Sequence, residues 1–362
     1  MNGLDGVIAA ETALSDVDGE GGRLIICGRS LDELVAHCRY EDVLTLLWAT
    51  LFPEGDGGNR LDGMLGQARA SVFEHLRAAD AHILGLPPVD AIRALLSRLE
   101  DEDDLRTALR LVAAPAVFTP AVIRLARGWD AIPPDPALSH AADVLRMLHG
   151  DTAQPAQVAA LDRYLVSASD HGLNASTFTA RVIASTRAGL TAALVGAFCA
   201  LKGPLHGGAP GPVLDMLDSV GRPEAAQPWL EAALARGERL MGFGHRIYRV
   251  RDPRADAIKE ALETLAQAGG LDPARLRLAE AVELAALEAL SRHKPGRPLQ
   301  TNLEFYTALL LEALGFPREA FTCVFAAGRA GGWVAHAREQ ALRGRLIRPL
   351  SAYVGPRSSE AA

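Results

Sequence analysis

Long apolar runs, paired cysteines and metal-ligand spacings are all scarce in this chain of 362 residues. Its four cysteines form no CxxC motif, which argues against a disulfide framework or a zinc site and fits a reducing cytoplasm. The most apolar helix-like run, residues 190–201, is shorter than the roughly 20 residues that cross a bilayer. We therefore expect a soluble, cytoplasmic protein with no membrane partner.

The chain also lacks an excess of positive charge and a secretory signal. It carries 37 lysines and arginines against 44 aspartates and glutamates, so its net charge is -7. Because a nucleic-acid partner requires a basic face that neutralises phosphates, this balance argues against one. The first residues, MNGLDGVIAAET, show no basic region followed by an apolar stretch. The arginines are then expected to bind small local anions.

Hydrophobic periodicity predicts a mainly α protein. A hairpin is expected within residues 7–28, where DVDGEGG separates two apolar stretches, and a glycine-rich loop at residues 54–59. A helix should begin near Ser30, and further helices are expected at residues 40–52, 61–79, 88–99, 105–126, 138–148, 152–168, 176–201, 213–220, 228–236, 253–268, 278–293, 303–314 and 329–343. The long run 176–201 is rich in small residues, which suggests a central helix or a subunit interface.

Residues 240–254, LMGFGHRIYRVRDPR, place one histidine between glycines and arginines. Gly242 and Gly244 tolerate backbone angles and close ligand approach that other residues resist, so His245 can lie in a tight turn. Guanidinium groups bind carboxylates or phosphates through paired hydrogen bonds, and four arginines follow His245: Arg246, Arg249, Arg251 and Arg254. The segment therefore indicates a site for an anionic ligand, with a solvated loop as the plain alternative.

Two further histidines lie in similar junctions. His171, in DHGLNAST, falls between two expected helices, where a polar side chain most often caps a helix or bonds within the fold. His206, in GPLHGGAPG, lies in a second glycine-rich turn. Either turn could be merely structural, but two histidines in such turns indicate a common cleft.

One carboxylate and two more arginines complete the candidate set. Glu304 begins the expected helix of TNLEFYTALLLEALG, where an acid also favours the helix dipole. Arg329 lies in AAGRAGGWVAH and Arg348 in LIRPLSAYVG, and each could form a structural salt bridge. Metal binding by these histidines and Glu304 is disfavoured, because no HExxH or comparable spacing is present.

Taken together, two turn histidines, a carboxylate and several arginines match one chemical need. Forming a carbon-carbon bond from an acyl thioester requires a carboxylate that takes the α-proton and a donor that stabilises the enol or enolate oxygen. A second donor must polarise the electrophilic carbonyl. If the electrophile is a small keto-diacid, arginines must hold its carboxylates.

These motifs resemble those of the citrate synthases. GPLHGG, GFGHRIYRVRDPR, NLEFY and GRAGGWVAH...LIRP...YVG occur in the order of that family, and SDVDGEGGRL and DHGLNASTFTARV extend the likeness over most of the chain. The resemblance implies a two-domain helical fold with a short N-terminal β-hairpin. The large, dimer-forming domain would comprise residues 1–210 and 315–362, and the small domain, residues 211–314, would close over the active site.

The resemblance also implies roles for the candidate residues. His206 would stabilise the enol of acetyl-CoA, His245 would polarise the oxaloacetate carbonyl, and Glu304 would be the base. The oxaloacetate and citrate ligands would be His171, Arg254, Arg329 and Arg348, and Arg249 would contact a coenzyme A phosphate. Arg348 would reach the neighbouring subunit's site in a homodimer.

The expected reaction joins acetyl-CoA, oxaloacetate and water to give citrate and CoA, with no metal and no permanently bound cofactor. Glu304 and the pair Pro210-Gly211 depart from the common pattern, which has Asp and Asn-Glu there; both changes resemble a bacterial citrate or 2-methylcitrate synthase-like subgroup. The alternatives are a 2-methylcitrate synthase that uses propionyl-CoA and a non-catalytic metabolite-binding relative. The extra N-terminal domain of the NADH-regulated type is not seen, so control by NADH is not expected.

Overall fold

A computed structural model describes the whole chain except residues 1–2, 5, 54–59, 78–80, 208–209 and 356–362. The glycine-rich loop expected at residues 54–59 lies outside this part. The strands are β1 Ser15–Asp18, β2 Arg23–Ile26 and β3 Arg29–Ser30. The helices are α1 Leu31–His37, α2 Tyr40–Trp48, α3 Arg60–Arg77, α4 Ala81–Leu84, α5 Pro88–Leu96, α6 Leu105–Ala126, α7 His140–His149, α8 Pro155–Ala168, α9 Ala175–Ser185, α10 Leu190–Leu201, α11 Pro210–Val220, α12 Ala226–Ala235, α13 Pro253–Gln267, α14 Pro273–His293, α15 Leu303–Ala313 and α16 Phe321–Arg343, with 3₁₀ turns η2 Pro223–Ala225 and η3 Arg318–Ala320.

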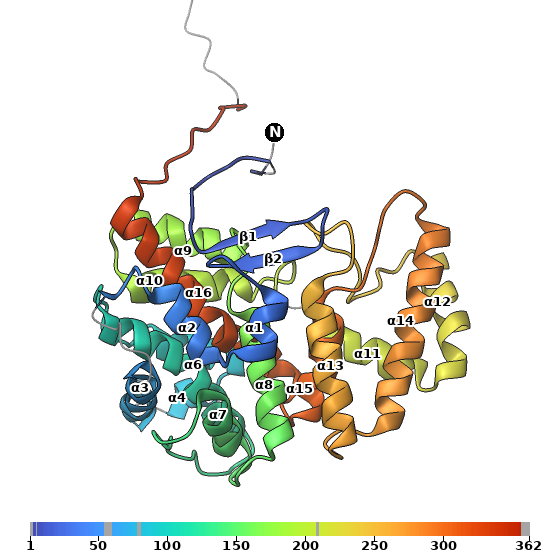
Figure 1. The fold of residues 1–362 in the computed structure, drawn as a ribbon, viewed down its shortest axis with the longest axis horizontal. Coiled ribbons are helices and arrows are strands. Elements are labelled where there is room, and N and C mark those ends of the chain that lie inside the picture. The colour runs from blue at the N-terminus through green and yellow to red at the C-terminus, as the bar shows by residue number, and fades with distance from the viewer. Residues whose placement is uncertain (1–2, 5, 54–59, 78–80, 208–209, 356–362) are drawn as a thin grey trace, which may run out of the picture.

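The mainly α fold and the N-terminal hairpin are both confirmed. β1 and β2 pair antiparallel from Ser15 opposite Ile26 to Asp18 opposite Arg23, and the short β3 pairs with β2. The turn between β1 and β2 is closed by Asp18, whose carboxylate accepts hydrogen bonds from Gly21 N and the Arg23 guanidinium. The hairpin lies along one edge of the helical body (Figure 1).

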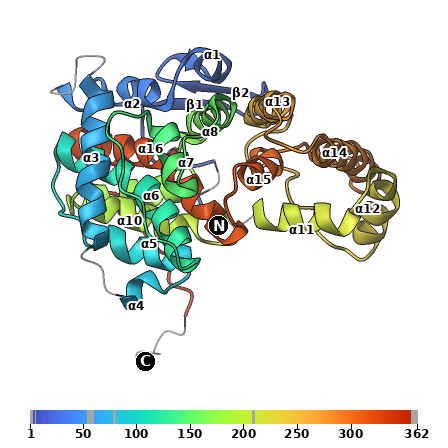
Figure 2. The ribbon, with the colours of Figure 1, turned by 90° about the horizontal axis from the view of Figure 1, so that it is seen from below.

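The helices form a body and an outer lobe. α6 and α16 run through the body, whereas α11, α12 and α14 lie to one side of it, with α13 and α15 in between (Figure 2). Among the described helices, α6 alone is long and apolar enough to cross a membrane, and 89% of its apolar window is buried inside the protein. α13 packs against α8 of the body and against α15, so these helices carry the junction between body and lobe.

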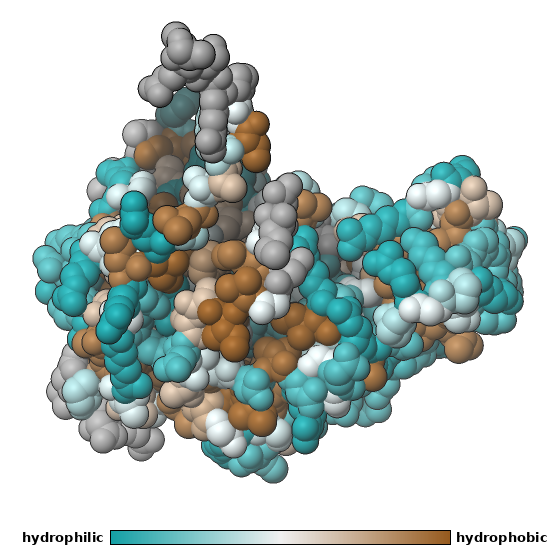
Figure 3. Space-filling model, turned by 90° about the horizontal axis from the view of Figure 1, so that it is seen from above, coloured by the Kyte–Doolittle hydropathy of each residue, from teal (hydrophilic) through white to brown (hydrophobic). Residues whose placement is uncertain are grey.

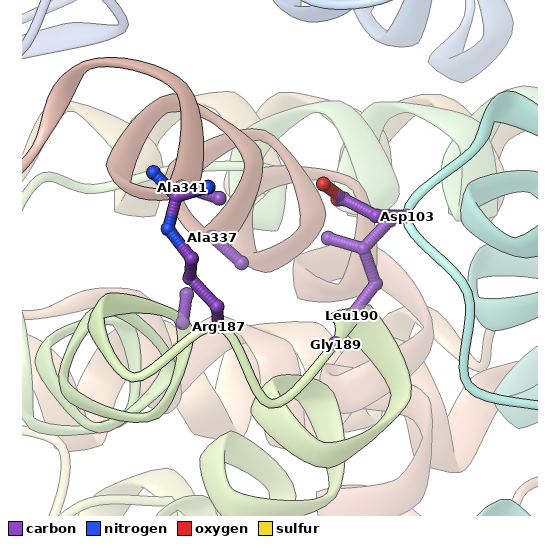
Figure 4. Close-up of a pocket in the computed structure, with 7 residues that line it drawn as sticks. Asp103, Arg187, Gly189, Leu190, Ala337 and Ala341 are labelled. Atoms are coloured by element: carbon purple, nitrogen blue, oxygen red, sulfur yellow. The ribbon is translucent and has the colours of Figure 1, made fainter.

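The prediction of a single helix at residues 176–201 is wrong. The chain forms α9 and α10, separated by a turn in which Arg187 has φ 62° and Gly189 has φ 99°. Asp101 explains the break, because its carboxylate accepts hydrogen bonds from Thr191 N and Ala192 N at the start of α10. The turn lies beside Ala337 and Ala341 of α16, with Arg187 reaching toward Ala341 (Figure 4). The two helices pack against each other.

The helix expected at residues 329–343 begins eight residues earlier than predicted, at Phe321, and it passes through glycines that usually weaken helices. A side chain at Gly331 would collide with Leu44, and one at Gly332 would collide with the backbone of Ser169. Packing therefore outweighs propensity, because these glycines let α16 approach α2 and the end of α8 closely. This approach places Arg329 in the centre of the molecule.

Candidate active site

The segment around His245 is joined to the start of α15 by a short stretch of strand-like pairing. Gly244 N donates to Gln300 O at 2.7 Å, and Asn302 N donates to Gly242 O at 3.0 Å. Gly242 and Gly244 both have φ 86°, and a Cβ on Gly242 would come within 2.8 Å of Phe305. The glycines therefore allow two segments that are distant in sequence to lie together, with His245 on one and Glu304 on the other.

The hydrogen bonds of the His245 ring determine which of its two nitrogens carries the proton. Its Nδ1 accepts hydrogen bonds from Ile247 N at 3.0 Å and Tyr248 N at 3.1 Å. Burial, together with the charge of Arg254, lowers the pKa of His245 to about 4. The imidazole is then neutral at pH 7 with its proton on Nε2, which lies 3.4 Å from a guanidinium nitrogen of Arg254. Two donors at this spacing can share one acceptor oxygen.

Arg254 is held at the N-terminus of α13 by the residue that caps this helix. Asp252 accepts from Arg254 Nε at 2.9 Å and from a terminal guanidinium nitrogen at 2.7 Å, and both side chains are buried. The same carboxylate accepts from Leu303 N at 3.2 Å. Asp252 thus ties the start of α13 to the start of α15 and orients Arg254 between His245 and Glu304.

His171 and Arg329 come from the body of the protein. His171 lies between α8 and α9, 4% exposed, and its ring centroid is 5.3 Å from that of His245. Burial and the charge of Arg254 lower its pKa well below the usual range. Arg329 donates from Nε to Ala168 O and has no ion pair among the described residues. Burial lowers the pKa of Arg329 to about 10, with Asp170 acting against this shift and nearby Arg254 adding to it, so the two neighbouring cations suit a dianion.

His206 is also neutral, with the opposite tautomer. Its Nε2 accepts from Ser176 N, one of the unpaired N–H groups in the first turn of α9, at 3.3 Å, and lies 2.8 Å from Ser176 Oγ. Because a backbone N–H can only donate, the proton of His206 lies on Nδ1. Burial first, then the charges of Arg329 and Arg246, lower the pKa of His206 to about 4.

Glu304 contributes a second carboxylate to this group, because its charge interacts with that of Arg254. It occupies the first turn of α15, where its backbone N donates to the capping Asn302 side chain at 3.0 Å. Burial raises the pKa of Glu304 to about 7, although Arg254 and Arg239 act in the opposite direction. A carboxylate with a pKa near neutrality is suited to accepting a proton at physiological pH.

This raised pKa predicts a pH-dependent effect of Glu304→Gln on stability. The pKa of Glu304 is near 7 in the folded protein, against an ordinary value of 4.5 in the unfolded chain. The folded state therefore binds this proton more tightly, and the resulting stabilisation is fully present below about pH 4.5 and is lost as the pH rises through 7. The glutamine side chain of the variant carries no charge at any of these pH values, so its folded state does not lose this stabilisation. We expect the variant's free energy of unfolding to exceed that of the wild type by about 1–2 kcal/mol near pH 8.5, allowing for partial exposure, and by much less near pH 5. Denaturant titrations at both pH values measure this; an equal difference at both would contradict the raised pKa.

Arg249 and Arg348 lie apart from the other six candidate residues. Arg249 is exposed, and its backbone N donates to Gly19 O of the hairpin turn at 2.9 Å. Arg348 is exposed in the extended segment after α16, whose Ile347 N donates to Ser185 Oγ at the far end of α9. Within its own chain Arg348 therefore does not reach the histidines.

Several residues that sequence reasoning did not single out hold this site together. The only sequence signal for Asp252, in DPR, and for Asn302, in TNLEF, is that each could cap the helix that follows it. Asn302 also donates from its side chain to Gly244 O at 2.9 Å. Ser176 and Tyr248 gave no signal, since their contacts with His206 and His171 depend on the tertiary fold.

Comparison with known proteins relates the chain to one family. The family model described as citrate synthase, C-terminal domain, matches residues 3–350. The chain belongs to the citrate synthase family. It is 37% identical to citrate synthase of Haloferax volcanii, over 98% of this chain and 95% of that one. It is 36% identical to 2-methylcitrate synthase of Mycobacterium tuberculosis, over 98% and 90%.

A solved structure in this family shows the same fold. The citrate synthase of Thermoplasma acidophilum, in a ternary complex with carboxymethyl coenzyme A and oxaloacetate, superposes with a TM-score of 0.85 at 26% identity. The match covers 99% of this chain and 96% of that one. Among the described residues, no group of three or more His, Cys, Asp or Glu side chains could hold a metal ion.

Proposed function

We propose that this protein is a citrate synthase that condenses acetyl-CoA with oxaloacetate and water to give citrate and CoA. One observation carries the proposal. Two neutral histidines of opposite tautomer, His206 and His245, accompany a carboxylate of raised pKa, Glu304, in a site with the arginines Arg254 and Arg329. This set contains each group that a Claisen condensation with a keto-diacid requires.

The reaction begins with binding of the dianion. Arg254 and Arg329 hold the two carboxylates of oxaloacetate, with His171 beside them, and His245 Nε2–H donates to the keto oxygen. This hydrogen bond polarises the carbonyl and makes its carbon more electrophilic. The same hydrogen bond from neutral His245 stabilises the negative charge that develops on this oxygen.

The thioester is then activated by two groups. Glu304 takes a proton from the methyl group of acetyl-CoA, while His206 Nδ1–H donates to the thioester oxygen and stabilises the enol. The new carbon nucleophile attacks the keto carbon of oxaloacetate, and the resulting alkoxide takes up one proton, which balances the one that Glu304 removed, to give the hydroxyl of a citryl thioester. Water then cleaves the carbon-sulfur bond, which releases citrate and CoA thiol.

Acyl preference is the finer question, because the chain is similar to both citrate and 2-methylcitrate synthases. An extra methylene in a pocket changes discrimination by only about 1–3 kcal/mol. We propose acetyl-CoA as the preferred substrate, in line with the citrate synthase of Haloferax volcanii, and keep propionyl-CoA as the alternative. Propionyl-CoA is then a slower substrate.

A thiol-release assay with oxaloacetate tests the proposed function. Acetyl-CoA should give oxaloacetate-dependent thiol release with kcat/KM about tenfold or more above that for propionyl-CoA. The reverse preference would make the protein a 2-methylcitrate synthase. Binding of oxaloacetate with no thiol release from either thioester would show a non-catalytic, metabolite-binding relative.

The site is further proposed to be completed by a second subunit and by domain closure. Apolar side chains are exposed on both terminal segments, among them Ile8 at 89%, Leu346 at 59% and Leu350 at 90%, which suits a homodimer interface. Apolar side chains also gather on the face shown in Figure 3. In this arrangement Arg348 reaches the neighbouring subunit's oxaloacetate, and Arg249 contacts a coenzyme A phosphate. Domain closure brings residues 211–314 against residues 1–210 and 315–362. The four cysteines are free, in keeping with a cytoplasmic enzyme.

Subunit mixing should reveal the shared site. If Arg348 serves the partner's site, a mixed dimer of Arg348→Ala and His245→Ala subunits has one intact site and one site with both lesions. After random exchange half of the dimers are mixed, so about a quarter of the sites regain activity, whereas each variant alone is inactive. Thiol release before and after exchange measures this. An exchanged mixture that stays inactive would place Arg348 outside the partner's site.

A further inference from the structure

Tyr248 is buried in a loop whose other side chains mostly face solvent. It is 1% exposed, whereas its neighbour Ile247 is 39% exposed and Val250 is 42% exposed. A buried tyrosine usually has a partner for its hydroxyl. Here the partner is a histidine of the candidate site, because Tyr248 Oη lies 3.2 Å from His171 Nε2.

The ring of Tyr248 contacts three of the residues assigned to oxaloacetate. Its centroid lies 4.8 Å from that of His245 and 5.4 Å from that of His171, and Arg254 Cζ lies 5.9 Å above the ring. Its backbone N donates to His245 Nδ1, which keeps the proton of that ring on Nε2. One side chain thus joins a histidine of the body to a histidine of the loop and to an arginine at the start of α13.

The hydroxyl of Tyr248 also fixes the protonation of His171. Nε2 is the His171 ring nitrogen that faces the Tyr248 hydroxyl, and because burial and the charge of Arg254 keep the imidazole neutral, Nε2 can accept a hydrogen bond. Burial raises the pKa of Tyr248 above its usual range, so the phenol keeps its proton and donates to Nε2. The imidazole is held neutral and in one orientation.

The N-terminal hairpin bridges the same two segments next to this contact. Gly19 O accepts from Arg249 N, which follows Tyr248, at 2.9 Å. Ser15 Oγ accepts from Gly172 N, which follows His171, at 3.0 Å. The loop of Tyr248 and the junction of His171 are therefore fastened to one common element, so their relative position is defined on both sides.

We propose that Tyr248 is a positioning residue for the keto-diacid. It acts through His171, His245 and Arg254, holding these three groups around one anion without itself taking part in proton transfer. The inference rests on the proposed function, since it takes oxaloacetate as the ligand. It assigns to Tyr248 an effect on oxaloacetate affinity that a purely structural tyrosine would not have.

Removing the hydroxyl alone tests the proposal. Tyr248→Phe should weaken oxaloacetate binding, measured by titration calorimetry, by about tenfold, with kcat and the KM for acetyl-CoA changed less than about twofold. Tyr248→Leu, which also removes the ring contacts, should weaken binding further.

Tyr306→Phe is a matched control, because it removes a buried hydroxyl that donates to Glu283 at 2.6 Å. It should lower stability and leave oxaloacetate affinity unchanged.

A double-mutant cycle separates positioning through His171 from general loosening of the loop. In a His171→Ala background, Tyr248→Phe should change oxaloacetate affinity by less than about twofold, because the partner of the hydroxyl is already absent. An equal loss in both backgrounds, or no loss in the wild-type background, overturns the inference. A wild-type protein that neither binds oxaloacetate nor releases thiol overturns the proposed function as well, whereas an active wild type with an unaffected Tyr248→Phe variant overturns the inference alone.

Discussion

Glu304→Gln should lower kcat about 10²- to 10⁴-fold, the usual contribution of a positioned general base. The amide has nearly the same size and keeps the first turn of α15, but it cannot accept the proton of the acetyl-CoA methyl group. Oxaloacetate affinity should stay within about twofold, since the arginines and His171 are unchanged. Steady-state thiol release gives the rate, and calorimetric titration gives the affinity.

The matched control lies on the same helix. Glu312, at the opposite end of α15 from Glu304, pairs with Arg275 of α14 at 2.9 Å, so Glu312→Gln should leave turnover unchanged. Glu304→Asp should also slow the reaction if the pocket is built for the longer side chain, because the carboxylate oxygen must come within reach of the carbon-bound proton. Full activity in Glu304→Gln would remove Glu304 from the mechanism, and a large gain in Glu304→Asp would favour the non-catalytic alternative.

Arg329→Leu should nearly abolish oxaloacetate binding while leaving the protein at least as stable. Loss of a buried charged contact to the ligand typically costs about 2–5 kcal/mol, or roughly 30- to several-thousand-fold in affinity. Yet burial of this unpaired cation lowers its pKa to about 10, so the folded state gains from its removal, against the loss of the hydrogen bond to Ala168 O. Calorimetry and thermal unfolding measure the two effects separately.

Arg69→Leu should have the opposite effects, with a loss of stability and no loss of oxaloacetate binding. Arg69 is as buried as Arg329, but it pairs with the fully buried Asp143 at 2.8 Å, and breaking such a pair costs about 3–5 kcal/mol. This variant should therefore unfold at a clearly lower temperature and, where folded, bind oxaloacetate normally. If Arg329→Leu were destabilised as strongly as Arg69→Leu and still bound oxaloacetate, Arg329 would be a structural residue.

Local pattern predicted most helices but not the two places where tertiary contacts decide. The break between α9 and α10 depends on Asp101, about 90 residues away, which caps α10. The continuity of α16 from Phe321 depends on close packing at Gly328, Gly331 and Gly332, residues that in isolation disfavour a helix. Periodicity carries no information on either partner, so neither feature could be predicted from the segment itself.

The candidate residues could be named from the sequence, but the geometry in which the fold brings them together could not be predicted. Glycine turns and the arginine-rich segment identified His206, His245 and Arg254, because a special backbone leaves a trace in the sequence. The tautomers of the histidines depend on N–H groups of Ser176, Ile247 and Tyr248, which became partners only on folding. The raised pKa of Glu304 likewise arises from burial, which composition does not reveal.

In the proposed mechanism Glu304 removes a proton from acetyl-CoA while the arginines hold a dicarboxylate. Exchange of the acetyl-CoA methyl protons with deuterated water tests it most directly, in the presence of malate, a dicarboxylate with a hydroxyl in place of the keto group of oxaloacetate. Proton NMR should show deuterium entering the methyl group with the wild type and with Glu312→Gln, but at a rate reduced at least about 100-fold with Glu304→Gln. Equal exchange by the wild type and Glu304→Gln would contradict this mechanism.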